Sequence, residues 1–472
     1  MRVFFGFFCS AFLSLVLLLG GPAVVRAQVF DSAWQARMAY ICALADMAVY
    51  SSSMNEAVRQ EMSQFGWQFK DYRQADRRAD TTFYTLVHEG SDGREALVVI
   101  PGTEKLKDVE VDLRFGKVLF GGTTPQEFRS FAATEKVTAN QPMVHQGFND
   151  YTMTAFFTPD ADGIMGADRL RELAADGNER LYLTGHSLGG AVATLLAARL
   201  VSMGVEPDKL SVFTFGAPTV GNTAFAEEYG YRIDLNRYTM GGDVVRNALQ
   251  ALKSGYVHFG TEYKWKKNEN SHKFNHAIVG YLDAAIRGYY DEILQGDLSM
   301  AGLAAAKEAD GNGAAQAGKP MQSWRQVSFA GRVYIAPAAL DLPEAIANDS
   351  AYMQVVAGDI LMHQFSQVVA DDSYARPGAA VDALFAACRR AEEAGCDKVA
   401  MINISGTADK ENPNLYRLAA AVEFYTTTGE PLLNTITSTT TQEITPIEAV
   451  MYDVTRAVAD IKEAQRQGVL PK

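Results

Sequence analysis

The sequence has few cysteines and an excess of acidic residues. The first feature restricts the disulfides and metal sites that the protein can form, and the second restricts its partners. Of its four cysteines, Cys9 lies in the first apolar segment, and the remaining three are an odd number that cannot all pair within one chain. Cys388 and Cys396 are either a disulfide pair or two buried thiols. No spacing of cysteines and histidines matches a zinc site. We expect neither a metal nor a cofactor. The net charge of −13 argues against a nucleic-acid partner.

Long apolar runs are lacking everywhere except at the N-terminus. There an apolar run from Val3 to Leu19 is followed by small residues that end at Ala27. This pattern is typical of a signal peptide, residues 1–27, cleaved before Gln28. The alternative is an uncleaved anchor, because the run approaches the roughly 20 residues that span a bilayer. Cleavage would leave a secreted or periplasmic protein.

Short apolar strands alternate with helical stretches over the first two thirds of the chain. Residues 31–65 have the spacing of an amphipathic helix, in which the apolar positions run from Trp34 to Val49. Strands are then expected at 82–87, 96–100, 181–184, 210–215 and 232–238. Alternation of this kind predicts an α/β fold with a mainly parallel sheet covered by helices.

A composition change divides the chain into two folded units. Residues 296–322 are rich in Ala and Gly and predict a linker between a domain at 28–295 and a smaller C-terminal domain at 323–472. The second domain is expected to be α/β or α+β, and no motif in it indicates a chemistry. Its predicted elements are strands at 332–336, 399–404 and 418–425, helices at 381–394 and 447–465, and a loop or edge strand at 435–441.

The run GHSLGG offers a nucleophile. Ser187 lies between Gly185 and Gly189, after a strand and before a small-residue helix, which is the context of a nucleophile elbow. A sharp strand-to-helix turn leaves no room for side chains at the two glycines, and it raises the serine hydroxyl above the sheet. The alternative is an ordinary βα turn in which Ser187 caps the helix.

A serine hydroxyl needs a base and a carboxylate that orients the base. In this type of fold the chain order is Ser, acid, His. Asp243, in a Gly-containing loop after a strand, satisfies the order, and the histidines that follow before the linker are His258, His272 and His276.

Several further motifs make the chain similar to the class 3 lipases, a family with the α/β-hydrolase fold that includes the fungal triacylglycerol lipases. The resemblance covers about residues 35–285. Pro101 stands where that family usually has Arg. The motifs, in the order of the family, are Pro101-Gly102-Thr103 with Asp108 and Asp112, Val144-His145-Gln146-Gly147-Phe148, GHSLGG, Phe215-Gly216-Ala217-Pro218 with Gly221-Asn222, and Tyr256-Val257-His258.

The resemblance implies a role for each matching residue. Ser187 matches the nucleophile and Asp243 the acid, although Arg246 follows where the family often has Pro. His276 matches the base better than His272, because it stands five residues before Tyr281 as in the family's H-x4-Y ending.

Other positions match the surroundings of the family's active site. Thr103 and Leu188 correspond to the oxyanion donors, and His186 completes the nucleophile elbow. His145, His186 and His258 correspond to packing or hydrogen-bonding residues. The segment 106–115 corresponds to a lid, but its alternation of apolar and charged residues equally fits a strand.

These observations predict a lipase or carboxylesterase that uses a Ser-His-Asp triad on lipid or other carboxylic esters, with transient contact to a lipid interface. The sequence leaves three alternatives open. One is an inactive hydrolase fold that binds an envelope protein through its C-terminal domain. The others are an esterase of polysaccharide esters and a peptidase that uses the same triad.

Overall fold

A computed structural model describes the chain from residue 32 to residue 467. The residues in that span that it does not describe are 51, 72–83, 91–92, 103–115, 136–137, 139, 161, 176–179, 244, 246–254, 269–273, 275, 296–330, 366 and 371–379. The predicted signal peptide, Thr103, the lid segment, His272 and the linker therefore lie outside the described residues.

The N-terminal unit is built on a seven-stranded sheet with the order β1-β2-β3-β6-β7-β9-β11. Its last five strands are parallel, and β1 and β2 join antiparallel at one edge. The predicted α/β fold with a mainly parallel sheet is confirmed. The strands are β1 (Trp67–Asp71), β2 (Tyr84–Gly90), β3 (Gly93–Ile100), β6 (Arg180–His186), β7 (Leu210–Phe215), β9 (Asp234–Met240) and β11 (Thr261–Trp265).

Apolar residues alternate between the two faces of this sheet, so each face carries its own core. Along β3, Val98 and Ile100 pack with α7 (Leu188–Ser202), whereas Leu97 and Val99 pack with α1 (Ser32–Tyr50) and α10 (Ile278–Gln295). Helices α5 (Gln146–Phe157) and α6 (Gly166–Ala175) share the α7 side. Burial on both faces explains why the strands read as nearly continuous apolar runs.

A smaller antiparallel sheet lies beyond α7. Its order is β10-β8-β5-β4, and its strands are β4 (Lys117–Leu119), β5 (Met143–His145), β8 (Gly221–Asn222) and β10 (Tyr256–Val257). Helices α4 (Pro125–Ala132) and α8 (Thr223–Tyr229) and the 3-10 turn η1 (Pro207–Lys209) complete this side.

The predicted N-terminal helix is two helices, α1 and α2 (Ser52–Gln64), and the second begins within a run of serines. Serine favours helix starts over helix interiors, because its hydroxyl competes for backbone hydrogen bonds. The prediction that the helix is amphipathic is wrong for α1. Every residue from Met38 to Ala48 is buried, as expected for a helix covered on all sides.

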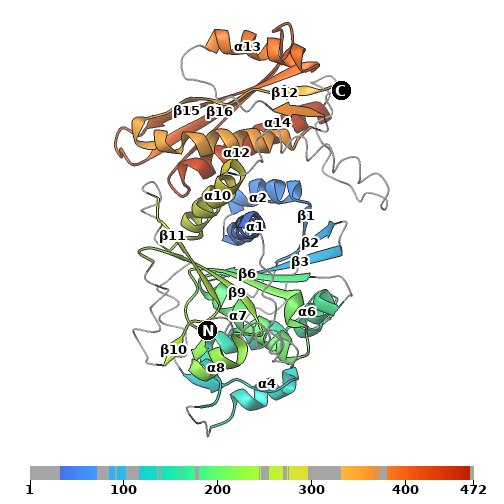
Figure 1. Ribbon diagram of the computed structural model, residues 1–472, viewed down its shortest axis with the longest axis vertical. Helices are drawn as coiled ribbons and strands as arrows, with labels where there is room; N and C mark the ends of the chain where they lie inside the picture. Colours follow the sequence, from blue (N-terminus) through green and yellow to red (C-terminus); the bar gives the residue numbers. More distant parts are fainter. Residues whose placement is uncertain are drawn as a thin grey trace, which may run out of the picture.

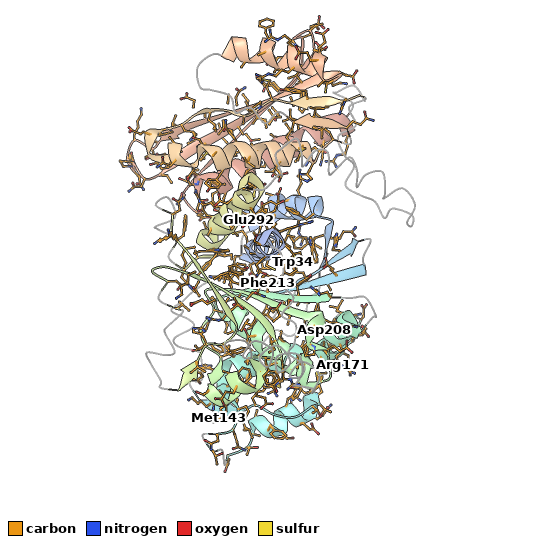
Figure 2. All side chains as sticks on the ribbon, viewed as in Figure 1. Trp34, Met143, Arg171, Asp208, Phe213 and Glu292 are labelled. Carbon is orange, nitrogen blue, oxygen red and sulfur yellow. The ribbon has the colours of Figure 1, made fainter. Side chains whose placement is uncertain are left out.

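The covering of α1 is visible in Figure 1, where α1, α2 and α10 form a layer between the seven-stranded sheet and the C-terminal unit. On the sheet side, Trp34 of α1 meets Phe213 of β7, with ring centroids 6.2 Å apart (Figure 2). On the other side, the Tyr40 hydroxyl lies 3.8 Å from Met451 Sδ of α14 (Pro446–Arg466). One apolar core thus runs through both units.

The C-terminal unit is a mixed six-stranded sheet with the path β14-β12-β15-β16-β17, and β13 also pairs with β15. Helices α12 and α14 cover one face, and α13 covers part of the other. The Thr-rich segment is the edge strand β17, whereas α12 was not predicted. The elements are β12 (Val333–Ile335), β13 (Ala339–Asp341), η5 (Glu344–Asp349), α12 (Ser350–Met362), β14 (Val368–Ala370), α13 (Ala380–Glu393), β15 (Lys398–Ala408), β16 (Tyr416–Thr426) and β17 (Pro431–Thr440).

Cys42, Cys388 and Cys396 are buried thiols outside any disulfide, so the second alternative for Cys388 and Cys396 holds. Among the described residues, no helix combines the length and apolarity that crossing a bilayer requires.

Candidate active site

Ser187 occupies a strained turn between β6 and α7. Its backbone φ is 56° and its ψ is −124°, and among the described residues it alone has a positive φ without being glycine. The two flanking positions must be glycine, because a side chain at either one would clash with neighbouring backbone atoms. A Cβ on Gly185 would meet the backbone of Gly189, and a Cβ on Gly189 would meet the carbonyl oxygen of Ile100. The predicted turn with two obligatory glycines is therefore present, and such strain is characteristic of functional sites.

The Ser187 hydroxyl lies against the His276 imidazole. Ser187 Oγ is 2.8 Å from His276 Nε2, which is hydrogen-bonding distance. Ser187 makes no side-chain capping hydrogen bond to α7, so the alternative that it serves as an ordinary helix cap has no support in the geometry. The Ser187 backbone N–H donates to the Phe215 carbonyl at 2.9 Å, which fixes the turn to the neighbouring strand β7.

Asp243 holds the other nitrogen of the His276 ring. Nδ1 of His276 is 2.9 Å from Oδ1 and 2.8 Å from Oδ2 of Asp243. An anionic carboxylate accepts hydrogen bonds and does not donate them, so Nδ1 carries the proton and Nε2 is left to accept from Ser187. The order of Ser, His and Asp contacts is the one that general-base activation of a serine requires.

Two further donors support the Asp243 carboxylate. The Tyr281 hydroxyl donates to Oδ2 at 2.6 Å, and the Val245 backbone N–H donates to Oδ1 at 2.9 Å. Burial acts to raise the pKa of Asp243. The hydrogen bonds from His276, Tyr281 and Val245 outweigh burial and hold this pKa below its ordinary value. Asp243 is thus an anion at neutral pH.

Gly216 leaves the space in which this carboxylate and hydroxyl meet. Its φ is +59°, and a Cβ there would be 2.7 Å from Asp243 Oδ2 and 2.8 Å from Tyr281 Oη. Sequence reasoning matched Tyr281 only as the end of the H-x4-Y spacing and gave it no role. The spacing itself was the available signal, because α10 begins two residues after His276 and the tyrosine, five residues after His276, lies in its first turn.

The other histidines occupy the places expected of supporting residues. His186 is buried, and its Nε2 is 2.6 Å from the carbonyl oxygen of His276. Burial, followed by the proximity of His276, lowers the pKa of His186 to about 3, so its ring is neutral. His145 precedes α5, where its Nδ1 accepts from the Phe148 N–H at 3.4 Å.

The oxyanion donors expected from the sequence are described only in part. Leu188 is the first residue of α7, so its N–H belongs to the first turn, whose amides have no acceptor within the helix. The positive end of the helix dipole lies at the same place. Gly102, which precedes Thr103, is described, and a Cβ on it would be 2.6 Å from the His186 carbonyl oxygen.

Comparisons with known proteins find similar sequences among the lipases. Residues 97–251 match the family model of the class 3 lipases. A lipase of Caenorhabditis elegans is 46% identical over 78 residues, which are 16% of this chain and 22% of that protein. The secreted mono- and diacylglycerol lipase A of Penicillium cyclopium is 35% identical over 118 residues, 25% of this chain and 37% of the relative. The chain thus spans less than two fifths of either relative.

Among solved structures, a lipase from Rhizopus microsporus var. chinensis is similar with a TM-score of 0.38 and 22% sequence identity. The match covers 50% of this chain and 75% of that one. The family match includes the end of β3 and all of β6, α7, β7 and β9, so the part of the N-terminal unit that carries Ser187 and Asp243 matches the class 3 lipase family.

Proposed function

We propose that this protein is a serine hydrolase that cleaves carboxylic esters of lipids through Ser187, His276 and Asp243. The observation that carries the proposal is the 2.8 Å contact between Ser187 Oγ and His276 Nε2 at a strained turn, with Asp243 on the opposite ring nitrogen. A nucleophile next to an oriented base is the arrangement of acyl transfer through a covalent intermediate. The match of residues 97–251 to the class 3 lipases supports a lipid ester as substrate.

In the first half of the reaction, Ser187 Oγ attacks the ester carbonyl carbon while its proton passes to His276 Nε2. Asp243 stabilises the imidazolium that forms. The tetrahedral intermediate collapses when its bond to the leaving alcohol breaks, and the alcohol oxygen takes the proton from His276. An acyl group then remains on Ser187.

In the second half, a water molecule gives a proton to His276 and attacks the acyl carbon. The bond to Ser187 Oγ breaks, the serine recovers its proton, and the carboxylic acid leaves. During both halves, the negative carbonyl oxygen needs donors. The N–H groups of Leu188 and Thr103 are proposed for this role, and removing one such donor typically costs about 100-fold to 1000-fold in turnover.

The direct test is Ser187→Ala with a short p-nitrophenyl ester. We expect at least a 10,000-fold loss of kcat with an unchanged circular dichroism spectrum. The matched control is Ser211→Ala, which removes another buried serine hydroxyl from the neighbouring strand β7 and should leave kcat nearly unchanged. Turnover retained by Ser187→Ala would overturn the mechanism.

A fluorophosphonate probe separates an active enzyme from an inactive binding protein with the same fold. It should label wild type at Ser187 and leave Ser187→Ala unlabelled. Absence of labelling in wild type would favour the binding-protein alternative. For the base, His276→Ala should abolish turnover and His272→Ala should retain it, and the opposite result would reassign the base to His272.

The substrate class is tested by an acyl-chain-length profile with soluble and emulsified esters. Activity that rises steeply above the solubility limit of the ester indicates a lipase, and saturation on soluble short chains indicates an esterase. Parallel assays with acetylated polysaccharide and peptide substrates address the two remaining alternatives.

Export is proposed from the first 27 residues alone. We expect the protein outside the cytoplasm with Gln28 as its first residue, which N-terminal sequencing of the exported form would show. A membrane-bound form that still begins with Met1 would indicate an anchor instead.

A further inference from the structure

Tyr50, the last residue of α1, connects three segments of the candidate active site. Its hydroxyl accepts a hydrogen bond from the Gly102 N–H at 2.9 Å, just beyond the end of β3. The same hydroxyl is 3.2 Å from His186 Nδ1, beside the nucleophile. The other nitrogen of His186 is 2.6 Å from the carbonyl oxygen of His276. A chain of three contacts thus runs from the segment before Thr103 to the segment that carries the base.

The direction of each hydrogen bond in this chain is fixed by chemistry. A carbonyl oxygen only accepts, so His186 Nε2 carries a proton and donates it to the His276 carbonyl. In a neutral imidazole the other nitrogen must then accept, so Tyr50 donates to His186 Nδ1. The tyrosine oxygen in turn accepts from Gly102. All three donors in this chain point the same way. The Tyr50 hydroxyl also lies 3.4 Å from the His186 carbonyl oxygen, a longer contact than the 3.2 Å to His186 Nδ1.

The surroundings hold this chain in one arrangement. The His186 side chain is buried, and its ring meets Tyr50 edge-on with centroids 5.4 Å apart and lies 4.8 Å from the His276 ring. Gly102 is tightly enclosed, because an added Cβ would meet both the Tyr50 hydroxyl and the His186 carbonyl oxygen. A neutral hydrogen-bonded chain of this kind rigidifies the segments that it joins.

We propose that Tyr50 is a positioning residue which, through His186, sets the oxyanion segment at Gly102 and the His276 backbone relative to Ser187. In this role Tyr50 acts through His186 and not on the reacting atoms. The proposal rests on the proposed function, because it assigns a role in the same reaction. It implies that α1, which lies outside the matched residues 97–251, is part of the catalytic apparatus.

The first test is Tyr50→Phe, which removes only the hydroxyl. We expect kcat on a short p-nitrophenyl ester to fall about tenfold, with KM changed less than twofold, because ground-state binding is unaffected and transition-state geometry is impaired. The Ki of a short alkyl boronic acid, which forms a tetrahedral adduct on serine, should rise by a similar factor. A Ki does not depend on the folded fraction, so a merely structural role would not change it.

The matched control is Tyr40→Phe, which removes the hydroxyl of the other tyrosine of α1. Its hydroxyl donates to Glu61 at 3.1 Å, on the side away from the elbow, so its loss should leave kcat and the boronate Ki nearly unchanged. Equal losses in Tyr50→Phe and Tyr40→Phe would overturn the proposal.

The second test addresses His186. His186→Gln keeps an N–H donor and an oxygen acceptor and should retain most of the activity, whereas His186→Leu should lose at least as much as Tyr50→Phe. Because both residues act in one chain, the double variant Tyr50→Phe/His186→Leu should be no slower than His186→Leu alone. Additive losses, or a His186→Gln variant as slow as His186→Leu, would overturn the proposal.

These outcomes are distinguishable from failure of the proposed function. If wild type neither labels with a fluorophosphonate nor hydrolyses esters, the proposed function fails first. If wild type is active and Ser187→Ala is not, while Tyr50→Phe retains full kcat and boronate affinity, only the role of Tyr50 is wrong.

Discussion

Helix α10 contacts two clusters of the same composition, each made of a tyrosine, an aspartate and a histidine. Near its first turn, Tyr281 donates to Asp243 at 2.6 Å, and Asp243 contacts His276 at 2.8 Å. Nine residues later, Tyr290 donates to Asp359 of α12 at 2.7 Å. Asp359 in turn lies 3.2 Å from His363 Nδ1.

The two clusters differ in the groups that lie next to their histidines. His276 comes from a loop and faces Ser187 at the end of another strand. His363 lies one turn after Asp359 on the same helix, and its Nδ1 also lies 2.8 Å from the Asp359 carbonyl oxygen. The carboxyl group of Glu61 is buried nearby and accepts from Tyr40. The comparison teaches that an acid–base pair becomes a candidate site only where a strained turn supplies the nucleophile.

The clusters also respond to pH in opposite directions. Hydrogen bonds lower the pKa of Asp243 against the effect of burial, so the stability that it contributes is present above about pH 4 and is lost as the pH falls. In the second cluster, burial acts to lower the pKa of His363, but Asp359 outweighs it and raises the pKa. That contribution is present at acid pH and is lost as the pH rises.

The largest expected difference between the clusters is catalytic. Asp243→Asn should lower kcat by about 10,000-fold, because the amide cannot hold the imidazole in the required tautomer. The matched variant Asp359→Asn should keep kcat within about threefold when the rate is normalised to sites labelled by a fluorophosphonate. Comparable losses in the two variants would show that the clusters are not functionally distinct.

A smaller effect is expected from the two tyrosines of α10. Tyr281→Phe removes a donor from the Asp243 anion and should lower kcat about tenfold, in the range of a hydrogen bond to a charged group. Tyr290→Phe removes the corresponding donor from Asp359 and should lower the unfolding temperature while kcat stays within about twofold. Steady-state kinetics and calorimetry on both variants measure the two effects, and a Tyr290→Phe variant as slow as Tyr281→Phe would contradict the assignment.

The sequence was sufficient to select Asp243 and His276 of the first cluster, but it did not predict the role of Tyr281 or the second cluster. A local turn motif and a fixed chain order restricted the candidates to Ser187, Asp243 and three histidines, and the resemblance to the family's H-x4-Y spacing selected His276. The parallel strands were predictable from apolar runs bounded by turn residues, and most C-terminal elements from periodicity.

The second cluster was missed because helix α12 has no polar face. Nine of its residues, from Met353 to Met362, are buried, and a helix covered on both sides loses the periodic pattern by which helices are recognised. The buried Asp46 of α1, which accepts from Thr184 at 3.0 Å, was unpredictable for the same reason. Such contacts depend on which helices meet, and that information is not local in sequence.

The smallest expected effect concerns stability and tests the pH response of the second cluster. Burial, followed by the charge of Asp359, raises the pKa of Glu61 from its ordinary 4.5 to about 8. The folded protein therefore keeps the Glu61 proton where the unfolded chain has lost it, and wild type should lose stability as the pH rises from about 4.5 to 8. The groups that face Glu61 are Tyr40, Tyr289, Asp359 and His363.

Glu61→Gln replaces the protonated acid by a neutral group of the same shape, so the variant should match wild type near pH 5 and exceed its unfolding temperature at pH 8. Because one pKa unit corresponds to about 1.4 kcal/mol, the gain at pH 8 should exceed about 1 kcal/mol. Calorimetry of both proteins from pH 5 to 8.5 measures the difference, in which the titrating groups that do not interact with Glu61 cancel. Glu227→Gln, at an exposed position of α8, should give a flat difference over the same range. A flat difference for Glu61→Gln as well would mean that Glu61 is ionised in the folded protein, and the contrast between the two clusters would be lost.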